Sequence, residues 1–316
     1  MKKYYEKITK IRYIHLTIVV LICMIVLGYV YIGQPYLTDK EHRAVNNNQD
    51  NKTIINNNNQ NNKTIVNNIN QNNNNQNNKI KEIGTSRYNG HLDLENKSIK
   101  LYNNIWGALG KELNSYILRL YVFYKSNDNF GWEWNRPDPS PGKYVTPVYP
   151  EAIMGTIPTG KDYTTNMFPI KYGDIKDWTS DIEFSYIKPP KGKYNLAYDI
   201  YWMDKDVKKF NIMIWVAGHH DEKPIGIVSD GINDYIHYHR GPGQGQYWDL
   251  HVFELKNQNE TNVKIDIKKL IDNAITKDNL NDNWIIPGVE LGSEVWNGYG
   301  RIEIYKYAVS INGRTN

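Results

Sequence analysis

The amino-acid sequence predicts an all-β domain of two packed antiparallel sheets with one short helix, preceded by a transmembrane helix and a disordered Asn-rich linker. Three observations predict this arrangement. A 20-residue apolar run lies near the N-terminus, a stretch made almost entirely of asparagine follows it, and short segments in which Tyr, Trp and Ile alternate with polar residues fill the remainder. Alternation with a period of two is typical of half-buried strands.

The N-terminal segments predict a membrane anchor. Residues 13–32 are mostly apolar and carry no formal charge, and they are long enough to cross a bilayer as a helix. The preceding tail, residues 1–12, is basic, so the positive-inside rule places it in the cytoplasm and the remainder outside. A cleaved signal peptide is the alternative, but the apolar run is long for one and no small-x-small site follows Val30. We therefore expect a single-pass type II membrane protein with an extracellular globular domain.

The next segment, residues 33–83, is predicted to be a disordered linker. Residues 45–79 are almost all Asn, with Gln, Lys, Thr and Ile. A short repeat occurs only twice and no bulky apolar residues recur, which excludes a solenoid and indicates low complexity. A flexible coil of about 35 residues spans on the order of 30 Å. The linker is expected to hold the domain away from the membrane surface.

Residues 84–316 have the composition of a globular β domain. Turn clusters such as PDPSPGK, KPPKGK and RGPGQGQ separate the alternating segments. One segment differs, because the apolar residues within 265–276 recur near helical spacing and predict a helix. The predicted strands lie within 97–107, 115–125, 181–187, 194–203, 210–216, 247–255 and 301–311.

Composition limits the classes of partner. The net charge is +4 and the pI about 8.7, and beyond the N-terminal tail the positive charge is spread along the chain, which does not favour a nucleic-acid partner. A single cysteine excludes an intrachain disulfide. The 25 Tyr and 9 Trp suit either a β-rich core or a surface that stacks on flat groups such as sugar rings.

Two predicted strands carry polar residues on an otherwise apolar face. Asn211, Met213 and Trp215 share one face of their strand because residues two apart point the same way, and Asp199 lies similarly in AYDIYW. Two further acids, Glu290 and Glu294, occur in VELGSEVWNG. Since most acidic side chains are solvated surface groups, composition does not choose among these acids.

Six motifs in this order make the chain resemble glycoside hydrolase family 12, the compact endoglucanases and xyloglucanases, over about residues 87–312. The helix at 265–276 also falls where that family has its single helix. The motifs are NNIWG (103–107), GWEW (131–134), YVTPVYPEAIMG (144–155), LAYDIYW (196–202), FNIMIWVAGHHDEKPIG (210–226) and VELGSEVWNGYGRIEIYKYAVSIN (289–312).

The resemblance implies a β-jelly roll whose concave sheet binds a β-1,4-glucan or related polysaccharide, and retaining hydrolysis by two glutamates. Glu294 matches the acid/base and Asp199 the acid that assists the nucleophile. The nucleophile position is occupied by Asn211. The resemblance implies no cofactor and no metal. The residues that it assigns to substrate binding are Asn104, Trp106, Trp134, Met213 and Trp215.

Asn211 makes hydrolysis the open question. A retaining glycosidase needs two carboxyl groups about 5–5.5 Å apart, and an amide is a poor nucleophile. The protein is therefore a carbohydrate-binding relative that has lost hydrolysis, or an enzyme in which Asp199 supports an inverting attack by water, or an enzyme that uses another acid. We favour the first of these three explanations. In that case the protein is a non-catalytic surface lectin or adhesion module and not an enzyme.

Histidines give a weaker signal. His219 and His220 follow the Trp215 strand, and His237 and His239 are spaced so that they could share a metal. Loop histidines are commonly solvated, and the family resemblance requires no metal, so we expect none.

Overall fold

The computed structural model describes residues 82–94, 99–114, 118–126, 129–243, 246–276 and 279–316. The predicted transmembrane segment at 13–32, the basic tail and almost all of the predicted linker lie outside these residues. Among the helices within the described ranges, none is long and apolar enough to cross a membrane.

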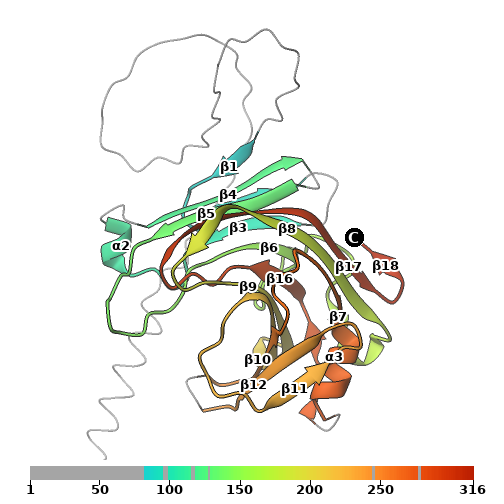
Figure 1. Ribbon diagram of the computed structural model, residues 1–316. Helices are drawn as coiled ribbons and strands as arrows, with labels where there is room; N and C mark the ends of the chain where they lie inside the picture. Colours follow the sequence, from blue (N-terminus) through green and yellow to red (C-terminus); the bar gives the residue numbers. More distant parts are fainter. Residues whose placement is uncertain (1–81, 95–98, 115–117, 127–128, 244–245, 277–278) are drawn as a thin grey trace, which may run out of the picture. The chain divides into compact units, whose positions relative to one another are not determined.

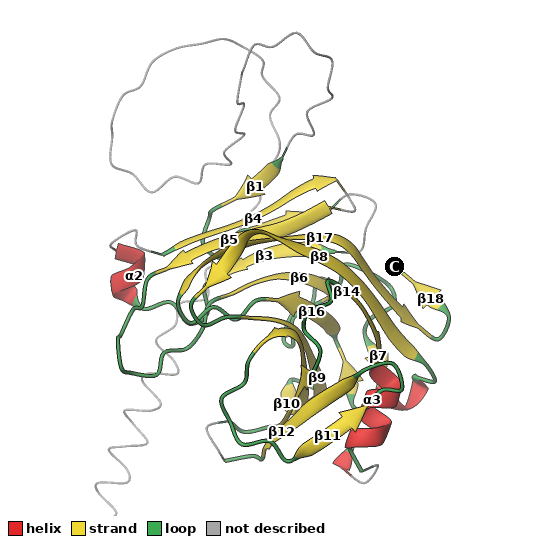
Figure 2. Cartoon of the chain, viewed as in Figure 1, coloured by secondary structure: helices red, strands yellow, loops and turns green. Residues whose placement is uncertain are grey.

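The described domain consists of two β-sheets, as predicted, and the strands form two layers with the short helices at their margins (Figures 1 and 2). The seven-stranded sheet has the order β1 (Ile83–Thr85), β4 (Arg119–Ser126), β5 (Asn129–Arg136), β17 (Gly298–Ile311), β8 (Trp178–Lys191) and β14 (Asn262–Asp266), with β18 (Arg314–Thr315) paired to β17. The eleven-stranded sheet has the order β11 (Gly226–Ser229), β12 (Asp234–Arg240), β13 (Asp249–Leu255), β10 (Val207–Gly218), β9 (Asn195–Asp204), β16 (Gly288–Gly292), β6 (Tyr149–Gly155), β3 (Lys100–Asn104) and β2 (His91–Asp93), with β15 (Ile285–Ile286) and β7 (Ile170–Lys171) at its margin.

Strand pairing departs from the prediction in one place. The described pairs are antiparallel except β10 and β13, which run parallel, with Asn211 opposite Leu250. A parallel neighbour requires a crossover, and β11 and β12 provide it before the chain returns as β13. The long segment between β10 and β13 therefore adds two strands to one edge of the larger sheet.

The main core lies between the sheets. Four buried tryptophans, from β5, β8 and β9, contribute to it, together with the apolar faces of the other long strands. A second, smaller cluster on the other face of the eleven-stranded sheet contains Ala197, Met213, Trp215, Tyr238 and Val252. We call this second face the site face. The four core tryptophans are Trp132, Trp134, Trp178 and Trp202.

The predicted helix is confirmed as α3 (Ile267–Ala274). The side chain of Asp266 caps it by accepting a hydrogen bond of 2.9 Å from the backbone N–H of Lys269. Its buried residues Ile267, Leu270 and Ile271 recur at helical spacing and pack into the main core. Two shorter helices also occur, α2 (Gly110–Asn114) and η1 (Tyr172–Asp174).

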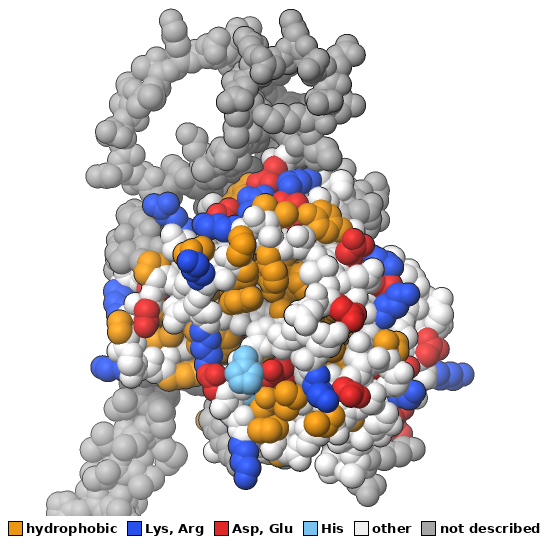
Figure 3. All heavy atoms as spheres, viewed as in Figure 1, with side chains coloured by type: hydrophobic (Ala, Val, Ile, Leu, Met, Phe, Trp, Pro, Cys, Tyr) orange, Lys and Arg blue, Asp and Glu red, His pale blue; other side chains and the backbone are white. Residues whose placement is uncertain are grey.

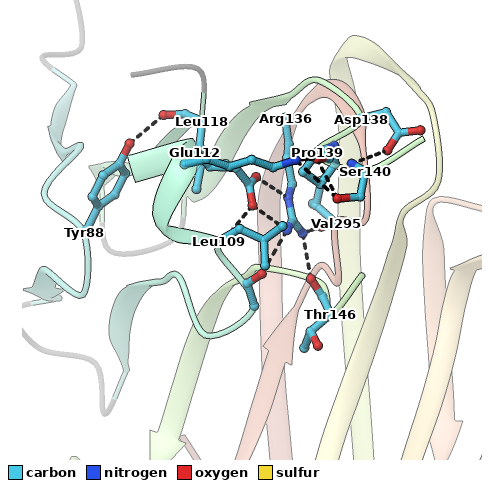
Figure 4. Close-up of polar contacts among 12 residues, drawn as sticks. Tyr88, Leu109, Glu112, Leu118, Arg136, Asp138, Pro139, Ser140, Thr146 and Val295 are labelled. Atoms are coloured by element: carbon cyan, nitrogen blue, oxygen red, sulfur yellow. Dashed lines mark hydrogen bonds and ion pairs between the residues drawn. The ribbon is translucent and has the colours of Figure 1, made fainter. Parts of the chain in front are cut away.

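A buried arginine joins three segments at one end of the domain (Figure 4). Arg136 is fully buried and forms an ion pair with Glu112, with 2.8 Å between Nε and Oε1. Its guanidinium also donates to the carbonyl oxygens of Gly107 at 3.0 Å and Val295 at 2.7 Å. Gly107 follows Trp106 and Val295 follows Glu294, so this contact fixes the backbone beside two of the predicted site residues.

Charge on the visible surface is mixed. On the face drawn in Figure 3, Lys and Arg side chains are interspersed with Asp and Glu and form no single basic patch.

Candidate active site

Strands β9 and β10 bring the predicted residues together on the site face. Their antiparallel register places Asn211 opposite Tyr201, Met213 opposite Asp199, and Trp215 opposite Ala197. Because alternate residues share a face, these side chains project from the same side of the sheet. The alternation in the sequence predicted one face with polar residues in each of β9 and β10. The register of the two strands places these faces side by side on one surface.

The side-chain amide of Asn211 points toward Asp199 and the backbone of β9 and β10. Its side chain is 2% exposed, and Nδ2 donates to Oδ1 of Asp199 at 2.6 Å and to the carbonyl oxygen of Ile200 at 2.9 Å. A third, longer contact of 3.3 Å reaches the carbonyl oxygen of Ile212. The amide nitrogen is therefore fully engaged by acceptors, and an amide in this arrangement acts as a hydrogen-bond donor to Asp199.

Asp199 is held as a hydrogen-bond acceptor. Its Oδ2 accepts from the hydroxyl group of Tyr201 at 3.1 Å, while Oδ1 accepts from Asn211. Burial raises the pKa of Asp199 to about 6, and these two hydrogen bonds, together with the charge of Lys208, oppose that rise. At neutral pH the carboxyl group is therefore mainly ionised.

Two further carboxyl groups lie beside Asp199. Glu290 on β16 is directly opposite Asp199, and Glu151 on β6 accepts a hydrogen bond of 2.9 Å from Nδ2 of Asn104. Burial raises the pKa of Glu151 to about 8, and burial and the neighbouring carboxyl groups raise that of Glu290 well above its usual range. Burial therefore favours the protonated form of both glutamates, and the pKa of Asp199 lies below that of Glu151.

Glu294 and Asn195 share three hydrogen bonds, two of which involve the side chain of Asn195. Nδ2 of Asn195 donates to Oε2 of Glu294 at 2.7 Å, and the backbone N–H of Glu294 donates to Oδ1 of Asn195 at 2.7 Å. Desolvation in the site, with a smaller contribution from the charge of Asp199, raises the pKa of Glu294 to about 8. A carboxyl group that is protonated at neutral pH is suited to donate a proton to a leaving oxygen.

The residues expected to bind substrate differ in how much of their side chains is exposed to solvent. Trp106 is 71% exposed, and its backbone N–H donates to Oδ1 of Asn104, which connects this loop to Glu151. Met213 and Trp215 lie on the site face but are buried, with Trp215 packed against Trp296 at 6.1 Å between ring centroids. Among these residues, Trp106 is the one that offers an open stacking surface.

The assignment of Trp134 to substrate binding is not supported. Its side chain is fully buried in the main core, on β5 of the other sheet, where its ring lies 5.6 Å from that of Tyr194. The alternation of β5 turns Trp134 inward together with Trp132. A sugar could not reach either ring without opening the space between the sheets.

Several residues on the site face were not predicted from the sequence. The ammonium group of Lys208 lies 4.0 Å from the ring centroid of Tyr201 and 5.0 Å from that of Trp248. Glu254, opposite Trp215, is buried and accepts hydrogen bonds from the hydroxyl of Tyr238 at 3.0 Å and the backbone N–H of His220 at 3.0 Å. The sequence did offer an indication that Glu254 is unusual, because this acid lies between the apolar residues Phe253 and Leu255 in the predicted strand at 247–255.

Comparisons with known proteins agree with this architecture. Endoglucanase S of Pectobacterium parmentieri is 29% identical over 234 residues, which cover 68% of this chain and 83% of that protein. The solved structure of a family 12 xyloglucanase from Bacillus licheniformis superposes with a TM-score of 0.61 at 24% identity, over 72% of this chain and 100% of that one. Endoglucanase Cel12A from Rhodothermus marinus superposes with a TM-score of 0.58 at 18% identity, over 74% of this chain and 99% of that one. No family model matches the chain.

Proposed function

Because the domain is related in sequence and fold to glycoside hydrolase family 12, we propose that it binds a β-1,4-linked glucan or xyloglucan chain on the site face, and that Asn211 blocks retaining hydrolysis. The observation that carries the proposal is the hydrogen bond of 2.6 Å between the amide of Asn211 and Asp199. It occurs at the position where the family resemblance requires a nucleophilic carboxylate.

The chemistry of the site supports binding without turnover. Glu294 is protonated near neutral pH, so an acid is present, but retaining hydrolysis also needs a carboxylate that forms the glycosyl ester. The amide of Asn211 is neutral, poorly nucleophilic and engaged by three acceptors. Glu151 and Glu290 are buried, and burial raises the pKa of both, which disfavours a negative charge at either position.

An inverting hydrolase is the second candidate. The pKa of Asp199, about 6, lies below that of Glu151, about 8, and an ionised carboxylate can serve as base for an attacking water. In this structure both oxygens of Asp199 already accept hydrogen bonds from Asn211 and Tyr201. A water activated by Asp199 would therefore use one of the remaining lone pairs of these oxygens.

The two candidates are distinguished by measuring binding and turnover on the same preparation. We expect cello-oligosaccharides and xyloglucan oligosaccharides to bind in calorimetry, and a reducing-sugar assay on the corresponding polysaccharides to give no signal above buffer. Turnover that survives Asn211→Ala and disappears with Asp199→Asn, with inversion seen by NMR of the first product, would establish the inverting enzyme instead. Absence of binding to every β-glucan tested would refute both.

We further propose that residues 13–32 anchor the protein in a membrane with the domain outside. The support is the length and apolar character of this segment and the basic tail before it. Full-length protein should sediment with membranes and resist alkaline carbonate extraction. Soluble protein whose sequence starts near residue 34 would show a cleaved signal peptide.

A further inference from the structure

A cluster of histidines and one aspartate lies on the opposite face of the eleven-stranded sheet from the site face. His239 on β12 is directly opposite His251 on β13, so their side chains project together from the same face. Asp249 precedes His251 by two residues and shares that face. Each of the three places one possible ligand atom within 4.8 Å of those of the other two.

The innermost member of the cluster has an unpaired nitrogen. His251 is 6% exposed, its ring stacks on that of Phe210 at 5.1 Å, and its Nδ1 is 2.8 Å from Nε2 of His237. Its Nε2 is buried and has no hydrogen-bond partner in the part of the chain that the structure describes. A buried polar nitrogen without a partner is costly and needs an explanation.

The outer members are partly open to solvent. Nε2 of His239 is 2.6 Å from Oδ1 of Asp249, and their side chains are 37% and 25% exposed. The rings of His239 and His251 are stacked, with 4.4 Å between centroids. These positions give an ion access from outside, while the third ligand is fixed in the interior.

We propose that His239, Asp249 and His251 form a binding site for a divalent transition-metal ion of the zinc class. Two imidazoles and one carboxylate are a donor set that such ions prefer, and a water molecule would complete a tetrahedral shell. Ligands of a tetrahedral zinc ion lie about 3.4 Å apart, so His239 and Asp249 must separate from their contact of 2.6 Å to hold an ion together with His251.

His237 would support the site from behind. When Nε2 of a histidine binds a metal, its Nδ1–H usually donates to a neighbouring acceptor, which orients the ring. His237 is placed to accept that bond from His251, with 2.8 Å between the nitrogens. The bound ion would join β12 to β13 near the edge of the sheet, so its expected role is to stabilise that edge and not to take part in chemistry on the site face.

The test uses the full-length chain, purified without a polyhistidine tag and freed of metal with a chelator. We expect titration with zinc chloride in a calorimeter to show one equivalent bound with a Kd in the micromolar range or below. Cobalt(II) at the same site should give visible absorption bands of a four-coordinate ion. Zinc should also raise the melting temperature of the unaltered chain.

His239→Ala and Asp249→Asn should each weaken zinc binding by tenfold or more and abolish the rise in melting temperature. Both side chains are partly exposed, so these variants are expected to fold, which circular dichroism checks. His91→Ala on β2, an exposed histidine outside the cluster, is the matched control and should bind as the unaltered chain does. Binding that is absent, or that is lost in His219→Ala while surviving His239→Ala and Asp249→Asn, would overturn the proposal.

Discussion

Nδ2 of Asn211 lies 2.6 Å from Oδ1 of Asp199, across the pair of antiparallel strands β9 and β10. The bond turns the amide toward the backbone and occupies one oxygen of Asp199, the residue that the family resemblance assigns to assisting the nucleophile. Under the proposed function, a neutral hydrogen-bond donor stands where a retaining enzyme needs a negative charge. We therefore expect hydrolysis to be lost.

Asn211→Glu should therefore create retaining hydrolysis of β-1,4-glucan. The substitution adds a carboxylate next to Asp199, whose charge acts on the protonated Glu294, and we expect turnover at least about 100-fold above the unaltered chain, which is about 2.8 kcal/mol of transition-state stabilisation. A reducing-sugar assay measures the gain, and NMR of the first product reports its anomeric configuration.

Asn211→Gln is the matched control for this gain, because glutamine has the length of glutamate without its charge. It should stay inactive, and Glu294→Gln added to Asn211→Glu should remove the new activity since the leaving oxygen then lacks its acid. Equal activity in the Gln and Glu variants would contradict a nucleophilic role for this position.

The two tryptophans expected to bind sugar should respond differently. Trp106 is 71% exposed, so Trp106→Ala should lower glucan affinity by about 1 kcal/mol, about fivefold, without changing the melting temperature. Trp215 is 3% exposed and packed, so Trp215→Ala should cost about 3–5 kcal/mol of unfolding free energy. Calorimetric titration and chemical unfolding on the same preparations separate these effects.

Tyr305→Ala is the control for Trp106→Ala, since Tyr305 is an exposed aromatic on β17 of the other sheet. It should leave affinity unchanged. If Trp106→Ala behaves as Tyr305→Ala does, sugar stacking on Trp106 is excluded.

Stability should fall as the pH rises from about 6.5 to about 8. The pKa values of Glu151 and Glu294 rise from 4.5 to about 8 on folding, and that of Asp199 rises from 3.8 to about 6. His220, His237 and His251 oppose this effect below about pH 6.5, because burial lowers their pKa values from 6.5. Above that pH the unfolded histidines are mostly neutral, so the folded chain binds more protons than the unfolded chain and the free energy of unfolding decreases with pH. Each group contributes at most about 1.4 kcal/mol per pH unit. Urea unfolding at a series of pH values measures the slope.

Glu151→Gln should make that slope shallower, because glutamine keeps the acceptor for Asn104 and does not titrate. The exposed Glu183→Gln should leave it unchanged. A free energy of unfolding that increases over the same pH range would show that these carboxyl groups do not hold their protons in the folded chain.

Arg136→Met should destabilise the domain by about 3–5 kcal/mol, because the buried carboxylate of Glu112 then loses its charged partner. It should also weaken glucan binding, since the carbonyl groups of Gly107 and Val295 lose the donor that holds the loops beside Trp106 and Glu294. Arg87→Met, at an exposed arginine, is the control for both measurements. An Arg136→Met variant as stable as the control would refute this account.

The sequence determined which segments become strands wherever one face is buried and the other is not. In β8, the buried residues Ile182 and Phe184 flank the exposed Glu183, and this alternation is evident in the amino-acid sequence alone. The helix at α3 was equally clear, because only a 3.6-residue period brings Ile267, Leu270 and Ile271 to one side. The six ordered motifs identified the family resemblance, which the comparisons confirm.

Two strands of the site carry no such alternation. All residues of β6 and β16 are buried. Their sequences therefore show no polar alternation from which the face that carries Glu151 and Glu290 could be told from the opposite face. The acids could be noticed in the sequence, but their position beside Asp199 depends on the order of strands β9, β16 and β6 in the sheet.

Only the tertiary structure decided the remaining placements. A register shift between Lys208 and Phe210 brings Lys208 to the aromatic rings of Tyr201 and Trp248, whereas strict alternation would place it with Phe210 on the core side. The pairing of β12 with β13 sets His239 opposite His251. The sequence determines the preference of each segment and the identity of Asn211, because these depend on local pattern. Neighbours across strands depend on register and strand order, which arise only when the sheets pack.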